Sequence, residues 1–101
     1  MPKVAEIQND PGAYIFECPG CGFAHKINTL QKDDGWPVWR FNNNLEKPTV
    51  TPSILVRYGR DQICHSFVTD GNIQFLNDCT HSLAGKTVEL TELDHYSHEN
   101  H

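Results

Sequence analysis

The sequence predicts a small, β-rich and mainly antiparallel single domain with one or two short helical turns. Two patterns lead to this fold class. Short apolar stretches alternate along the 101 residues with turns that contain Gly, Pro, Asn and Asp. In addition, Asp70-Gly71 lies between two such stretches, and this dipeptide is typical of the two-residue turn of a β-hairpin. The length suits one domain and leaves no room for a second.

The elements are expected in a simple order along the chain. Strands are predicted at 13–17, 23–28, 37–41, 53–58, 62–69, 72–77 and 87–91. Residues 78–85 are predicted to form one helical turn that ends at Gly85. Residues 42–52 are predicted to be an ordered but irregular loop, because Pro48 and Pro52 lack the backbone donors that a central strand needs. The domain is expected to span 1–93, followed by a polar, solvated tail at 94–101 that carries His95, His98 and His101.

The hairpin allows its side chains to be assigned to faces. If Asp70 and Gly71 are the two turn residues, Thr69 opposes Asn72 and the pairing runs backward from there. Side chains alternate between the faces of a strand. One face then carries Cys64, Ser66, Val68, Ile73, Phe75 and Asn77, and it extends to Cys79 and, in an extended chain, to His81. The other face carries His65, Phe67, Thr69, Asn72, Gln74 and Leu76.

Composition and charge exclude several classes of protein. The net charge of −5, with only eight Lys and Arg, argues against nucleic-acid binding and against binding to an anionic membrane. The first ten residues contain no signal peptide, and no apolar run approaches the ~20 residues that span a bilayer. We therefore expect a cytoplasmic protein. In a reducing compartment its four Cys are read as metal ligands before disulfides.

The motif Cys18-Pro-Gly-Cys21-Gly predicts half of a zinc site. Pro19 presets a tight turn, and the glycines let backbone N–H groups approach the sulfurs. A structural zinc needs four ligands. Because the hairpin places Cys64 and Cys79 on one face, two ligand sets remain open: Cys18, Cys21 and Cys64 with either Cys79 or His81. An iron–sulfur cluster would also accept four Cys, but the spacing does not favour one. The expected fold is therefore zinc-ribbon-like.

Several motifs follow one another over roughly residues 14–91: CPGCGxxH, a Trp-containing strand, PTVTPSIL and CHSFVTDGNIQFLNDCTHSLAGKTVEL. In this order they resemble a family of small phage and prophage proteins of unknown function, which implies location in the host cytoplasm. Members often carry the label "ammonia monooxygenase", which we reject because that chemistry belongs to a membrane copper enzyme. The family pattern accepts Ser at the position of Cys79, so the resemblance implies Cys18, Cys21, Cys64 and His81 as the ligands.

The sequence leaves three functional readings open, and the first two of them use a zinc site. A closed set of four ligands favours a non-catalytic interaction module that binds a protein partner, and on this reading the chain is not an enzyme. The alternative is a zinc-dependent hydrolase or deaminase with an open metal position and His25, His65 or Asp78 as base, although the usual motifs of such enzymes are absent. A thiol–disulfide protein is the third reading. A nucleophilic Ser53 with His65 as its base rests on residue type alone, so the sequence does not favour it.

Overall fold

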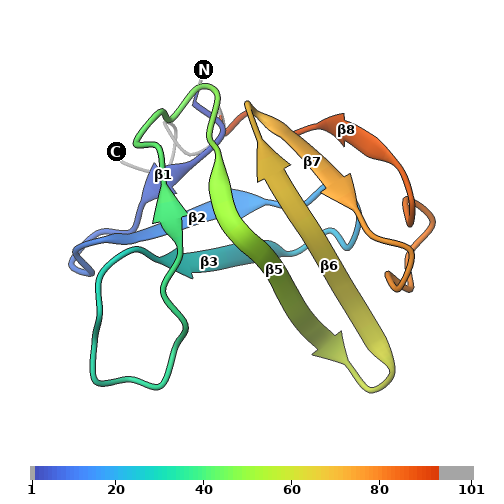
Figure 1. The fold of residues 1–101 in the computed structure, drawn as a ribbon, viewed down its shortest axis with the longest axis horizontal. Helices are drawn as coiled ribbons and strands as arrows, with labels where there is room; N and C mark the ends of the chain where they lie inside the picture. Colours follow the sequence, from blue (N-terminus) through green and yellow to red (C-terminus); the bar gives the residue numbers. More distant parts are fainter. Residues whose placement is uncertain (1, 94–101) are drawn as a thin grey trace.

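The computed structural model describes residues 2–93, which form two antiparallel sheets (Figure 1). The smaller sheet has the order β1-β2-β3, with β1 (Ala5–Glu6), β2 (Ala13–Glu17) and β3 (Ala24–Asn28). The larger sheet follows the chain order and consists of β4 (Arg40–Phe41), β5 (Val50–Gly59), β6 (Gln62–Thr69), β7 (Asn72–Phe75) and β8 (Thr87–Glu89). The predicted β-rich antiparallel fold is confirmed, while the predicted tail with His95, His98 and His101 lies outside the described residues.

The core lies between the two sheets, whose strands cross one another in Figure 1. Phe16 and Ile27 come from the smaller sheet and are fully buried. They belong to one cluster with the inward side chains of the larger sheet, among them Ile54, Val68 and Phe75. Full burial of such a side chain contributes about 1.5–3 kcal/mol. The contact between the sheets is therefore what turns two short sheets into one domain.

The hairpin of β6 and β7 has the predicted turn and register. Asp70 and Gly71 have φ angles of 51° and 82°, as a turn with two left-handed residues requires. Thr69 pairs with Asn72, and Ser66 pairs with Phe75. Cys64 is consequently buried on the core side, whereas His65 lies on the outer face and is only partly covered.

The first half of β5 differs from the prediction. Residues 42–52 were expected to be a loop, but β5 begins at Val50, includes Pro52 and lies between β4 and β6. The pairing between β5 and β6 shifts between Val50 and Ile54, so that 51–53 on β5 lie opposite Phe67 alone on β6. Proline is tolerated in a sheet at such an irregularity, because no ladder hydrogen bond is required of it there.

The segment after β7 forms turns. The helical turn predicted at 78–85 is replaced by two single turns, closed by bonds from Ala84 N–H to the carbonyl of His81 at 3.2 Å and from Lys86 N–H to that of Leu83 at 2.9 Å. Residues 2–93 therefore contain no regular helix, and hence no helix that could cross a membrane.

Candidate functional site

Four side chains with metal-binding atoms meet between the two sheets. Cys18 and Cys21 lie in the turn between β2 and β3, His25 lies on β3, and Cys64 comes from β6 of the larger sheet. One ligand atom from each of them lies within 4.8 Å of the others. This group can therefore hold a metal ion. An ion bound there would join the two sheets directly.

The Cys-Pro-Gly-Cys segment forms a tight turn for local reasons. The N–H of Gly22 donates to the carbonyl of Cys18 at 3.0 Å, and the N–H of Cys18 donates to the carbonyl of Phe23, also at 3.0 Å. Gly22 has a φ angle of 80°, which residues with a side chain rarely adopt. At Gly20 the reason is space, because a Cβ there would lie 2.4 Å from Cε1 of His81.

The spacing of the four ligand atoms fits a tetrahedral ion. With metal–sulfur and metal–nitrogen distances typical of zinc, a tetrahedron has sulfur–sulfur edges of about 3.8 Å and sulfur–nitrogen edges of about 3.6 Å. The Sγ atoms of Cys18 and Cys64 are 3.6 Å apart, and Sγ of Cys21 is 3.4 Å from Nε2 of His25. His25 is 2% exposed, and its ring packs edge-on against Phe16. Its orientation is thus determined by the core.

The three sulfurs differ in the direction in which their surroundings shift the pKa. The hydrogen bond from Cys64, supported by nearby His25, lowers the pKa of Cys18 to about 3 although burial acts in the opposite direction. The same hydrogen bond, together with burial, raises the pKa of Cys64. Burial also raises the pKa of Cys21. A metal ion binds thiolates. A divalent cation could replace the proton that Cys18 and Cys64 share in their hydrogen bond, and it would stabilise both sulfurs as thiolates.

Cys79 and His81 belong to a neighbouring group. Together with Cys64 their ligand atoms also lie within 4.8 Å of one another. Nδ1 of His81 accepts a hydrogen bond from the N–H of Leu83 at 3.2 Å, while its Nε2 is buried without a partner in the described residues. The predicted ligand set of Cys18, Cys21, Cys64 and His81, with Cys79 as the alternative to His81, stays a prediction. The structure brings its first three members together with His25.

A Ser-His-Asp arrangement lies on the outer face of the larger sheet. Nε2 of His65 is 3.0 Å from Oγ of Ser53, and Nδ1 of His65 is 3.0 Å from Oδ2 of Asp78. Both distances are hydrogen-bond distances, and each ring nitrogen has a different partner. A histidine bridging a hydroxyl and a carboxylate in this way is the geometry of nucleophilic serine catalysis, which is recognised by roles and not by chain order.

Three different elements bring the triad together. Ser53 lies on β5 within the register shift, His65 on β6, and Asp78 in the turn after β7. The indole N–H of Trp39 donates to the carbonyl of Ser53 at 3.2 Å, which holds the backbone of the hydroxyl-bearing residue. Trp39 itself is buried in the core cluster. The backbone of Ser53 is therefore anchored to the packed core, although the side chains of the triad face solvent.

Only some residues of these two sites were predicted from the sequence. It identified Cys18, Cys21 and Cys64, and it assigned His65 to the face opposite the sulfurs, as observed. It considered His25 as a possible base but left it out of both predicted ligand sets, and only residue type connected Ser53 with His65. The spacing of His25, four residues after Cys21 on the returning strand, was the available signal for a fourth ligand.

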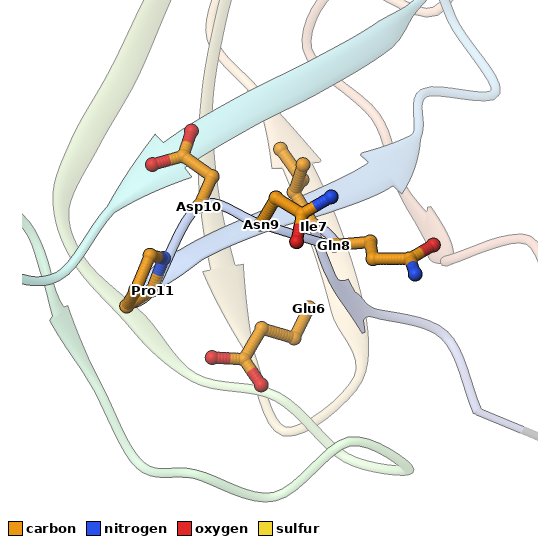
Figure 2. Close-up of a pocket in the computed structure, with 6 residues that line it drawn as sticks. All are labelled: Glu6, Ile7, Gln8, Asn9, Asp10 and Pro11. Carbon is orange, nitrogen blue, oxygen red and sulfur yellow. The ribbon is translucent and has the colours of Figure 1, made fainter.

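A shallow hollow elsewhere carries no comparable chemistry. It lies over the turn between β1 and β2 and is lined by Glu6, Ile7, Gln8, Asn9, Asp10 and Pro11 (Figure 2). Asp10 is paired there with Lys26 and Lys32, and these partners lower the pKa of its carboxyl. The hollow contains no member of the sulfur cluster or of the triad.

Comparison with known families adds an independent observation. Residues 2–76, three quarters of the chain, match a family model described as bacterial ubiquitination-like system serine protease (BubE). Ser53 and His65 lie inside the matched region, and Asp78 lies two residues beyond its end. No curated protein and no solved structure matches the chain.

Proposed function

This chain belongs to the BubE family, described as a bacterial ubiquitination-like system serine protease, and we propose that it is a serine hydrolase that cleaves an acyl bond in a peptide or protein. The observation that carries the proposal is the pair of 3.0 Å hydrogen bonds by which His65 bridges Ser53 and Asp78. The family description supports the same reaction class and suggests a substrate within a ubiquitination-like system. A phage origin and a cytoplasmic location stay predictions.

The chemistry follows from the positions of three atoms. Oγ of Ser53 attacks the carbonyl carbon of the substrate, and Nε2 of His65 takes the hydroxyl proton. Oδ2 of Asp78 accepts a hydrogen bond from Nδ1–H of His65, which fixes the tautomer whose Nε2 is free to act as a base. His65 then returns the proton to the leaving group, and water releases the acyl group from Ser53 by the same steps.

We assign a structural role to the metal and propose that it is zinc. The group offers three sulfurs and one nitrogen, a ligand set that zinc prefers, and a zinc ion held by all four would have no open position for a reactive water. This argues against the zinc-dependent hydrolase or deaminase considered from the sequence. In this proposal the metal joins the sheets that support the triad, and the protein partner expected from the sequence becomes the substrate.

The surface around the triad suits an extended substrate segment. The triad lies on an open sheet face, and Leu55, which pairs with His65 across β5 and β6, is 49% exposed. Phe67, two residues beyond His65 on the same face of β6, is 39% exposed. Exposed apolar side chains beside a polar centre are typical of recognition surfaces. We infer that apolar side chains next to the scissile bond contact Leu55 and Phe67.

A fluorophosphonate probe tests the proposal without knowledge of the natural substrate. The probe phosphonylates an activated serine and releases fluoride, and mass spectrometry then locates the adduct. We expect labelling at Ser53, with a loss of at least about 10³-fold in labelling rate in Ser53→Ala. Ser66→Ala is the matched control, because Ser66 lies on the neighbouring strand but faces the core. Absence of labelling in the native protein, or equal labelling of Ser53→Ala, would refute the proposed function.

A further inference from the structure

The thiol of Cys79 makes two hydrogen bonds to the backbone of His65. Its Sγ accepts from the N–H of His65 at 3.2 Å and donates to the carbonyl of the same residue at 3.1 Å. A thiol can do both at once, because it has one proton and free electron pairs. Cys79 is 8% exposed, so water does not compete freely for these bonds.

These bonds continue the sheet beyond the end of β7. The strand ends at Phe75, and one further backbone bond, from the N–H of Leu76 to the carbonyl of His65 at 2.9 Å, extends the pairing with β6. Cys79 and Thr80 then lie along the next part of that edge. The N–H of Thr80 donates to the carbonyl of Ile63 at 3.0 Å, and its hydroxyl accepts from the N–H of Ile63 at 2.9 Å. The turn carrying Asp78 is therefore attached to the strand carrying His65 by backbone bonds and by the side chains of Cys79 and Thr80.

A role of Cys79 as metal ligand conflicts with these contacts. A ligating sulfur is a thiolate and has no proton to give to the carbonyl of His65. The group of Cys18, Cys21, His25 and Cys64 already provides four ligands. The position of the Cys79 sulfur is thus better explained by its hydrogen bonds to the backbone of His65 than by metal binding next to Cys64.

We propose that Cys79 is a positioning residue for the catalytic base, an inference that rests on the proposed function. It holds the backbone of His65 directly and, as the neighbour of Asp78 in the chain, keeps the carboxylate within 3.0 Å of Nδ1 of His65. Loss of these bonds lets base and carboxylate drift apart, and a misplacement of about 1 Å can cost roughly 10²-fold in rate.

The test compares Cys79→Ala and Cys79→Ser in the full chain. We expect Cys79→Ala to lower the maximal rate of phosphonylation of Ser53 by about 10–10²-fold, with an unchanged concentration dependence and unchanged metal content. Cys79→Ser keeps one donor and one acceptor and should restore most of the rate. In an Asp78→Asn background Cys79→Ala should have little further effect, because both changes impair the same hydrogen bond to His65.

The possible failures are distinguishable. If the native protein is not labelled at Ser53, the proposed function fails. If it is labelled but Cys79→Ala reacts at the native rate, only the positioning role is refuted. Loss of bound metal in Cys79→Ala would make Cys79 a ligand and overturn the inference, as would failure of Cys79→Ser to recover activity while it remains folded by circular dichroism.

Discussion

Replacing His25 by Ala tests which histidine completes the metal site. Its Nε2 lies 3.4 Å from Sγ of Cys21, close to the edge of a zinc tetrahedron, and the residue is almost fully buried. Structural zinc in small peptides binds with about 10–16 kcal/mol, or roughly 2.5–4 kcal/mol for each of four ligands. We therefore expect His25→Ala to weaken zinc binding by about 10²–10³-fold.

The weaker zinc binding of His25→Ala should also lower the free energy of unfolding of the zinc-loaded protein. With free zinc above both dissociation constants, the stabilisation of the folded state falls by the same roughly 2.5–4 kcal/mol. A domain of this size loses about 4–8 °C in melting temperature per kcal/mol, so a decrease of at least about 10 °C is expected. The difference between zinc-loaded and zinc-free samples of each variant isolates the metal contribution from the cavity that His25→Ala also creates.

Competition with a chelator of known affinity measures the binding, and X-ray absorption counts the sulfur and nitrogen ligands. His81→Ala is the matched control. It should keep native zinc affinity, because the four proposed ligands are Cys18, Cys21, His25 and Cys64 and do not include His81. Zinc loss in His81→Ala together with native binding in His25→Ala would refute the reasoning and restore the ligand set implied by the sequence resemblance.

Two further predictions concern the support of the site. Trp39→Phe removes the N–H that donates to the carbonyl of Ser53, so probe labelling of Ser53 should slow several-fold. The free energy of unfolding, measured in urea, should fall by about 1 kcal/mol. Labelling at the native rate would exclude a role of Trp39 in holding Ser53. Phe75→Ala empties the centre of the core and removes the ring 4.5 Å from that of His81, which should cost about 3–5 kcal/mol in calorimetry. A cost below about 1 kcal/mol would show that Phe75 is not an essential part of the core.

Local features of the sequence determined much of the fold. Asp70-Gly71 can form only a few turns, and the two-residue turn sets the register of β6 and β7. Because side chains alternate along a strand, that register placed Cys64 in the core and His65 outside. The two Cys of the Cys-Pro-Gly-Cys motif were likewise predictable, since their relation depends on four consecutive residues.

The tertiary structure decided which distant residues meet. Ser53 reaches His65 only through the pairing of β5 with β6, and that pairing contains a shift around Pro52 which alternation cannot predict. Asp78 reaches the same ring because the turn after β7 is attached to β6 by Cys79 and Thr80. His25 joins Cys64 because the two sheets cross over a common core. Each contact depends on packing between elements, which the local pattern of the chain does not encode.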